Sequence, residues 1–255
     1  MLQLKSKKEK NLDNFKRFDT SDWEQVSKRI TYRLINKKVF DNTDEYKDII
    51  HKDCMDLTKV FMISEVSNDR KNVIIHDISE NDLNMFGKTI DDIIESVKNN
   101  KNIDSIKRIQ TLMQHTMSNE VLYPIMRVPD SAMLSVGNNG TITDTQEDKE
   151  NVLIVTNKYN VYGASYMLDF NTLDDIYKRM NDNFYIIPQS AHSFMCISSE
   201  YACNNKSMKE AEDDMLDMLY RLNESNSRTE DILSYKIYKY IRDDGCALVP
   251  IKQSL

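Results

Sequence analysis

An alternation of hydrophobic and polar residues indicates a half-buried β-strand over residues 30–36. One face carries Ile30, Tyr32 and Leu34, and the other carries Thr31 and Arg33. Two β-rich runs follow at residues 57–66 and 72–78, and the polar residues between them favour a turn. We expect these runs to pair as an antiparallel hairpin. Residues 37–52 are mostly polar and indicate no more than a helical turn near residues 44–50.

A second β-rich region lies between residues 151 and 198. Its apolar runs and turns predict a hairpin, a helix and then two strands. We expect residues 152–157 to pair with a strand that starts at Gly163. The tyrosine-rich run at residues 235–241 favours a terminal strand by its β-propensity, with a helix as the alternative.

A capping pattern predicts where ordered structure begins near the N-terminus. Ser21 is followed three residues later by Glu24, which is the spacing of a capping box. We therefore expect a short helix from Asp22, with Trp23 as the side chain that anchors this part of the chain.

Helical spacing of apolar residues predicts three longer helices. The first is capped at Thr89 and runs to Val97, and the second covers residues 103–117. The third is capped by Ser207, with Glu210 three residues on. Its apolar stripe consists of Met208, Ala211, Met215, Met218 and Leu222. Because its acidic residues lie largely off that stripe, one side of this helix should face a core and the other the solvent.

Together these elements predict an α+β fold of antiparallel β-hairpins and sheet with packed helices. We expect residues 1–20 to form a basic flexible tail and residues 21–255 to form a single domain. A mobile loop is expected over residues 130–150, which are rich in Gly, Asn, Thr and Asp. At 255 residues and 40% hydrophobic content, the chain is long enough to bury a packed core.

The composition narrows the class of protein. Five Gly and four Pro leave little material for a glycine-rich phosphate loop, which argues against the common nucleotide-dependent enzymes. No apolar run approaches the roughly 20 residues of a membrane span, and the charged N-terminal residues do not fit a signal peptide. We expect a cytoplasmic protein that makes no membrane contact. Its four cysteines are then reduced thiols rather than a disulfide framework.

The charge of the chain is unevenly distributed. A net charge of −7 at pH 7 is modest for this length and unlike that of a nucleic-acid mimic. Residues 1–17 nevertheless carry a net charge of +4, as in a solvated tail, with a nucleic-acid-binding arm as the less favoured alternative. The basic residues of this arm are Lys5, Lys7, Lys8, Lys10, Lys16 and Arg17.

The titratable residues give no catalytic constellation. Ser190 and His192 would share a face in an extended chain, but no glycine flanks Ser190 to supply oxyanion donors. His192, Cys196 and Cys203 lack the tight ligand spacing of a zinc site. Adjacent carboxylates in the predicted helices point about 100° apart, so they favour helix starts rather than acid–base chemistry. We expect no catalytic residue, no metal and no cofactor.

Several motifs occur in a fixed order along the chain. They are Tyr32-Arg-Leu-Ile-Asn36, Asp56-Leu-Thr-Lys-Val-Phe61, Asn81-Asp-Leu-Asn-Met-Phe-Gly87, Val152-Leu-Ile-Val-Thr-Asn157, Gly163-Ala-Ser-Tyr166 and Phe184-Tyr-Ile-Ile-Pro-Gln-Ser-Ala-His192. In this order they resemble an uncharacterised bacterial family, catalogued as a domain of unknown function (DUF5688-like), over residues 21–245. Members share a tract of strand, Thr-Asn, turn, Gly-Ala, helix and Phe-Tyr-Ile-Leu-Pro-Ser-Ser-x-His-Glu. This chain keeps Asn157, Gly163, Pro188, Ser190 and His192 of that tract.

Two positions depart from the tract. Gln189 stands where a Ser is usual, and Ser193 stands where a Glu is usual after the histidine. The second change argues against a chemical requirement for a His-Glu pair. The resemblance implies an intracellular protein of low-GC Gram-positive anaerobes, often encoded on phage-like or transferable elements, and it supplies no activity.

The leading hypothesis is a non-enzymatic protein that binds a protein partner of unknown identity. The family context alone suggests an anti-defence or regulatory action on host or rival proteins. An enzyme or small-molecule binder with a pocket around Ser190 and His192, together with Asn157 and Tyr32, is the first alternative. A nucleic-acid binder that uses the basic arm is the second.

The candidate binding residues are Tyr32, Asn157, Gly163, Pro188, Ser190 and His192. We expect the last five to cluster at one end of a sheet, since they belong to strand ends and turns of one unit. In that cluster Pro188 would stop a strand, Gly163 would allow a close approach, and Ser190 and His192 would satisfy backbone groups.

Overall fold

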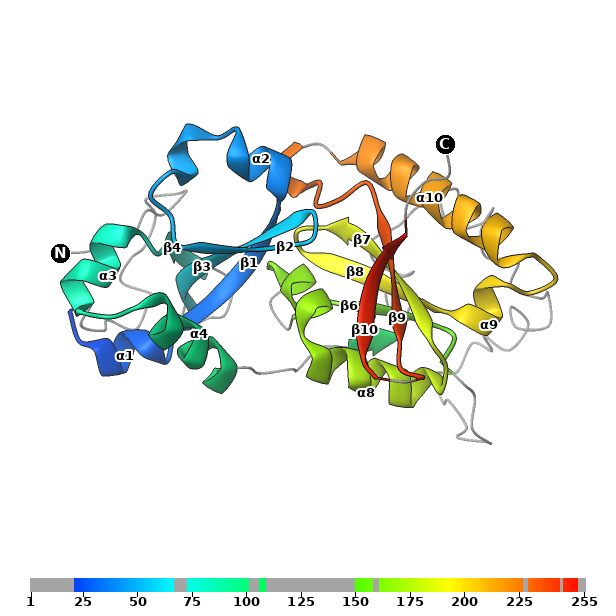
Figure 1. The fold of residues 1–255 in the computed structure, drawn as a ribbon, viewed down its shortest axis with the longest axis horizontal. Helices are drawn as coiled ribbons and strands as arrows, with labels where there is room; N and C mark the ends of the chain where they lie inside the picture. Colours follow the sequence, from blue (N-terminus) through cyan, green and yellow to red (C-terminus); the bar gives the residue numbers. More distant parts are fainter. Residues whose placement is uncertain are drawn as a thin grey trace, which may run out of the picture.

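The computed structural model describes residues 21–66, 73–100, 106–108, 150–157, 161–226, 229–243 and 245–251. This part of the chain forms two antiparallel sheets with helices packed against them (Figure 1). The predicted α+β class is therefore confirmed. The predicted tail of residues 1–20 lies outside the described residues, as does the loop of residues 130–150 except for Glu150. The division into a tail and a single domain stays a prediction.

β3 is the central strand of the N-terminal sheet. β1 pairs antiparallel with one edge of β3, and β2 and β4 pair one after the other with the opposite edge. The strands are β1 (Ile30–Asn36), β2 (His51–Cys54), β3 (Leu57–Val66) and β4 (Val73–Asp77). The expected strand over residues 30–36 and the expected hairpin of residues 57–66 with 72–78 are confirmed. β2 was not expected, because its residues are exposed and polar.

Short helices accompany this sheet. They are α1 (Trp23–Ser27), α2 (Lys37–Asp41), the 3-10 helix η2 (Asp44–Tyr46), α3 (Glu80–Phe86) and α4 (Ile90–Asn99). α1 begins one residue later than expected, because Asp22 rather than Ser21 is the N-cap and accepts the backbone N–H of Glu24. Trp23 packs on Phe86 with 5.6 Å between ring centroids, as expected of an anchoring side chain.

The C-terminal sheet has the strand order β10-β9-β7-β8-β6-β5, and every neighbouring pair is antiparallel. Its strands are β5 (Ile106–Arg108), β6 (Val152–Val155), β7 (Phe184–Ser190), β8 (Ser193–Ser198), β9 (Ile237–Ile241) and β10 (Ala247–Ile251). β9 confirms the terminal strand predicted from the tyrosine-rich run. The β7–β8 hairpin confirms the two strands predicted at the end of the 151–198 region.

Helices cover both faces of the C-terminal sheet (Figure 1). The helices of this half are the 3-10 helix η3 (Gly163–Leu168), α8 (Phe170–Met180), α9 (Ser199–Ala202), α10 (Met208–Ser225) and the 3-10 helix η4 (Thr229–Asp231). Alternate residues of β7 face opposite helices: Phe184 and Ile186 share a buried cluster with α8, and Tyr185 and Ile187 share one with α10. α10 begins with the predicted capping box of Ser207 and Glu210.

Two predictions about pairing and helix content are wrong. Gly163 does not begin a strand that pairs with residues 152–157; it begins η3, and β6 pairs with β8 instead. The reason is the left-handed backbone of Tyr162, with φ of 55°, which turns the chain out of the extended direction. The predicted helix over residues 103–117 is wrong at residues 106–108. These residues form β5, because antiparallel pairing with the edge of β6 stabilises an extended backbone there. Its other residues lie outside the described ranges.

The two halves of the described chain share buried contacts. One cluster of buried residues contains Leu34 and Phe61 from the N-terminal sheet together with Phe184 and Phe194 from the C-terminal sheet. Polar groups also cross between the halves. The Asp56 carboxylate accepts hydrogen bonds from the hydroxyls of Ser234 and Tyr238, at 2.6 and 2.9 Å. The same contact region brings η3 against β1, and this positions the candidate site.

Candidate functional site

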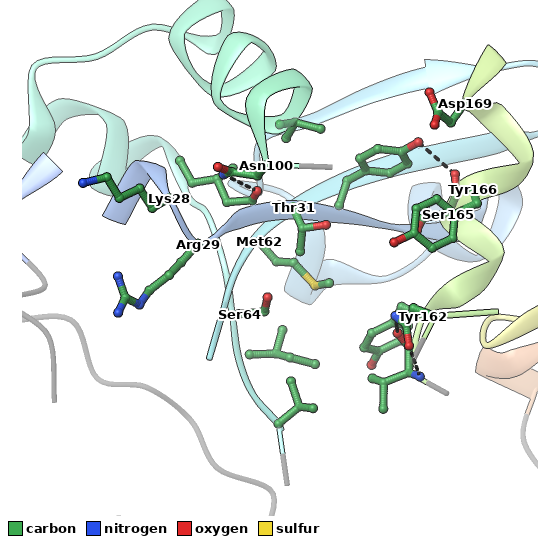
Figure 2. A pocket seen from close by; sticks show the side chains of 17 residues that line it. Lys28, Arg29, Thr31, Met62, Ser64, Asn100, Tyr162, Ser165, Tyr166 and Asp169 are labelled. Carbon is green, nitrogen blue, oxygen red and sulfur yellow. Dashed lines mark hydrogen bonds between the residues drawn. The ribbon is translucent and has the colours of Figure 1, made fainter. Parts of the chain in front are cut away.

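A cavity of about 300 Å³ lies where β1, α4 and η3 meet (Figure 2). Its wall combines apolar, aromatic and polar side chains, among them Tyr32, Met62, Ile75, Asn157, Tyr162 and Tyr166. Figure 2 shows Lys28 and Arg29 at one end and Tyr162, Tyr166 and Asp169 at the other, with Thr31, Met62 and Ser64 between them. A concave site on which several polar groups converge is a candidate binding pocket.

Tyr162 is held in an unusual conformation at the edge of this cavity. A left-handed backbone is uncommon for a bulky residue and costs about 1–3 kcal/mol, so the surroundings must stabilise it. The Asn157 side chain does so from one side: its Oδ1 accepts the N–H of Val161 at 3.1 Å, and its Nδ2 donates to the C=O of Val161. From the other side, the N–H of Tyr162 donates to Nδ1 of His192 at 3.1 Å.

Gly163 follows Tyr162 and lies against the end of β6. A Cβ atom at this position would lie 2.5 Å from the backbone N of Asn157 and 2.6 Å from the Cα of Thr156. Neither backbone atom can give way as the end of a side chain could, so only glycine fits. The close approach expected of Gly163 from the sequence is confirmed.

His192 ties this turn to the β7–β8 hairpin. Because its Nδ1 accepts a hydrogen bond, that nitrogen carries no proton, and the proton of the neutral ring is on Nε2. Nε2 lies 3.7 Å from Oδ1 of Asp231. The C=O of His192 accepts the hydroxyl of Thr156 at 2.8 Å, and its ring lies 5.3 Å from that of Tyr162.

Ser190 and Pro188 belong to the backbone structure of the β7–β8 hairpin. The Ser190 hydroxyl accepts the backbone N–H of His192 at 3.1 Å, so it satisfies a backbone group as expected. Neither ring nitrogen of His192 is directed at Ser190, since one faces Tyr162 and the other Asp231. The expectation that Pro188 stops a strand is wrong, because β7 continues to Ser190. Pro188 lies at a shift in the β7–β8 register, and β9 pairs only with residues 184–186 of β7, so no ladder partner from β9 lies opposite its ring.

The Tyr32 hydroxyl joins the N-terminal sheet to η3. It donates to the C=O of Ser165 at 2.8 Å. Burial, followed by the nearby charge of Asp169, raises the pKa of Tyr32 above its ordinary value, so this phenol stays protonated. Of the six candidate residues, Tyr32 and Asn157 line the cavity, and Gly163 and His192 hold Tyr162 beside it. Ser190 supports His192, and Pro188 lies further along the hairpin.

Two features of the site were not expected from the sequence: Tyr162 itself and the ion pair that faces it. Arg33 on β1 and Asp77 on β4 form a bidentate pair, with N–O distances of 2.6 and 3.2 Å. Burial opposes the charge of the guanidinium, but the Asp77 carboxylate outweighs this and raises the pKa of Arg33. The guanidinium carbon lies 5.4 Å from the centre of the Tyr162 ring and 5.8 Å from that of Tyr46. The sequence feature that could have indicated this ion pair is Arg33 itself, a charged residue within a strand of alternating hydrophobic and polar residues.

Within the described ranges, no three His, Cys, Asp or Glu side chains gather in an arrangement that would hold a metal ion. Burial raises the pKa of the Cys196 thiol well above its ordinary value, which makes it a poor ligand. No helix within the described residues combines the length and the apolar character that a membrane crossing requires.

Comparison with known proteins identifies a family and no activity. The model of a "Family of unknown function (DUF5688)" matches residues 1–242 of the chain. No curated protein and no solved structure matches it.

Proposed function

We propose that this chain, which belongs to that family of unknown function, is a non-enzymatic binding protein whose cavity receives part of a protein partner. The observation that carries the proposal is the cavity itself, with three tyrosine rings in its wall and one of them fixed by the turn at Tyr162. A preformed wall of this kind loses little conformational freedom when a ligand binds. A costly left-handed tyrosine held beside a cavity supports a ligand-binding site.

The titratable groups around the cavity support binding rather than catalysis. Lys28 pairs with Glu24, Arg29 pairs with Glu65, and the raised pKa of Tyr32 keeps its hydroxyl protonated. The Ser190 hydroxyl and a His192 nitrogen do not face each other, so the pocket proposed around them as an enzyme site lacks a nucleophile beside its base. A partner from a host or rival cell, and nucleic-acid binding by Lys5, Lys7, Lys8, Lys10, Lys16 and Arg17, stay predictions.

Small probes that carry a peptide group test whether the cavity binds ligands. N-acetyl-tyrosine amide and N-acetyl-valine amide should shift the backbone NMR signals of Thr31, Ser64 and Tyr162 in the full chain. Ser64 has a small side chain in the middle of the cavity (Figure 2), so Ser64→Trp should fill the space and abolish these shifts. Lys52→Trp, on an exposed position of β2 outside the cavity, is the matched control and should keep them.

Two results would contradict the proposal. One is the absence of shifts at the cavity with either probe. The other is an equal response in the wild type and in Ser64→Trp, once circular dichroism has shown that the variant is folded. A folded Thr31→Phe variant serves as a second block if Ser64→Trp does not fold, because Thr31 also lines the cavity.

A further inference from the structure

We infer that the ligand of this cavity is an extended peptide segment that pairs, as an additional strand, with the edge of β1 that no described strand occupies. The inference rests on the proposed function and names the class and conformation of the ligand. Addition of a strand to a sheet edge is a general mode of peptide recognition, in which main-chain hydrogen bonds supply affinity. Three observations support an extended peptide as the ligand: the hydrogen-bond register of β1, the lining of the cavity and the charge of the cavity.

The register of β1 shows which of its peptide groups face away from β3. The C=O of Arg29 accepts the N–H of Ser64 at 3.0 Å, and Thr31 is opposite Met62 in the same register. In an antiparallel pair, hydrogen-bonded positions alternate with positions that point outward. Ile30 and Tyr32 therefore direct their N–H and C=O groups to the outer edge. The C=O of Ile30 confirms this, because it accepts Nδ2 of Asn100 at 3.0 Å.

The next outward position along this edge is Tyr32. Among the residues that the structure describes, none donates to its C=O or accepts from its N–H. Tyr32 is nevertheless 8% exposed. Buried peptide groups are nearly always paired, with protein, water or ligand. One residue of an extended ligand would pair with both groups of Tyr32 through its own N–H and C=O, as one rung of an antiparallel ladder.

The cavity opens beside this edge. Five consecutive residues, 28–32, line it. Side chains of a strand alternate between its two faces, so a cavity on one face would meet only every second residue. Contact with consecutive residues shows that the cavity reaches the edge of the strand, where a peptide backbone would lie about 4.8 Å from β1. Met62, Ser64 and Ile75 show that it also extends over one face of the sheet, where side chains of the peptide would lie.

The charge and lining of the cavity define the segment. Lys28 and Arg29 are each paired with a glutamate, so this end presents no net charge to a ligand. The wall offers Met62, Ile75 and Val97 beside the tyrosine rings. Asp169 at the opposite end disfavours an acidic ligand, so the matching partner is a segment without acidic residues that carries apolar or aromatic side chains at alternate positions.

The test begins with a random heptapeptide library displayed on phage and selected on the full chain. A synthetic peptide from the selection is then titrated by calorimetry into the wild type, Ser64→Trp and Lys52→Trp. Binding should be retained by Lys52→Trp and lost in Ser64→Trp. A series of the same peptide, each N-methylated at one amide, should show a loss of about tenfold or more at the amide that pairs with Tyr32, and tolerance at its neighbours.

A change in the protein tests the same hydrogen bond from the other side. Tyr32→Pro removes the outward N–H without removing a β1–β3 hydrogen bond. It should weaken the affinity for the peptide by about tenfold. Tyr32→Ala loses the same ring and hydroxyl but keeps the N–H, and it is the control against which the loss in Tyr32→Pro is measured. If Tyr32→Pro does not fold, the N-methyl series still decides the question.

Several outcomes would overturn the inference. They are a library that yields no binder above background, a peptide that binds Ser64→Trp as well as the wild type, and an N-methyl series with no sensitive position. If these occur while N-acetyl amino-acid amides still bind in the cavity, the proposed binding function stands and only the extended-peptide ligand is wrong.

Discussion

The turn at Tyr162 depends on single atoms contributed by separate segments. Asn157 holds Val161, His192 holds the N–H of Tyr162, and Gly163 leaves room for the end of β6. Each of these residues either forms a hydrogen bond with a backbone group or leaves space for one, so their stabilising effect should be measurable without any ligand. Two substitutions separate the steric contribution from the hydrogen-bond contribution.

Gly163→Ala should destabilise the protein by about 1–3 kcal/mol, because its Cβ would meet backbone atoms 2.5–2.6 Å away. Gly87→Ala is the matched control. Gly87 has φ of 60° and no atom within 4 Å of an added Cβ, so that change adds only left-handed strain of about 1 kcal/mol. Urea unfolding of both variants measures the difference. Equal stability of the two would show that the turn relaxes around Gly163.

His192→Ala should lower the free energy of unfolding by about 1–3 kcal/mol, because it leaves the N–H of Tyr162 without its acceptor. His192→Asn offers a side-chain oxygen in place of Nδ1 and should recover part of the loss. Thermal unfolding of both variants gives the comparison. Unchanged stability in His192→Ala, together with lost binding of the cavity probes, would instead make His192 a direct ligand contact.

At the scale of elements, local chemistry decides where helices begin. Capping boxes start α3, α4 and α10, and in each case an acidic side chain accepts the backbone N–H of the N-cap residue. The box of α3 has an additional partner, because the Asp82 carboxylate also lies 3.0 Å from Nε2 of His76 on β4. This cap therefore connects a helix start to the N-terminal sheet.

The α3 cap predicts a contribution to acid sensitivity. Burial raises the pKa of Asp82, but hydrogen bonds from His76 and Ser79 outweigh it and bring the pKa below its ordinary value of 3.8. A carboxyl whose pKa is lowered on folding stabilises the protein above its unfolded pKa, and this stabilisation is lost as the pH falls through the folded pKa. Asp82→Asn should therefore reduce the loss of stability between about pH 5 and pH 2.

Urea unfolding at a series of pH values measures this effect. Glu80→Gln changes an exposed carboxylate of the same helix and is the control. If Asp82→Asn and the wild type lose stability in parallel as the pH falls, Asp82 makes no net contribution to the acid response.

At the scale of the molecule, contacts between the two halves create the cavity. β1 comes from the N-terminal sheet and η3 from the C-terminal half, and the Tyr32 hydroxyl bonds across them to Ser165. Buried side chains of both sheets belong to one cluster. The shape of the cavity should therefore be sensitive to anything that loosens one half from the other.

Tyr238→Phe tests how the halves are joined. Its hydroxyl donates to Asp56 of the other half at 2.9 Å, so its removal should cost about 1 kcal/mol. Because of the shared buried cluster, we expect the wild type and the variant each to unfold in a single calorimetric transition, with the variant at a lower Tm. Two separate transitions in the wild type would contradict the predicted single domain over residues 21–255.

By itself, the sequence determined the features that depend on neighbouring residues. The alternation over residues 30–36 predicted β1, the apolar runs around residues 67–71 predicted the β3–β4 pairing, and Ser207 with Glu210 predicted the start of α10. It also singled out Asn157, Gly163, Ser190 and His192, which do gather at one turn. Periodicity and capping act over a few residues, so they can be read along the chain.

Only the tertiary structure decided which strand pairs with β6 and which side chain the turn presents to the cavity. Tyr162 is bound by His192, 30 residues later, and Tyr32 by Ser165, 133 residues later. The Arg33–Asp77 pair likewise joins two strands that are not neighbours in the sheet. Contacts over such separations depend on how the two sheets pack, and local patterns carry no information about that packing.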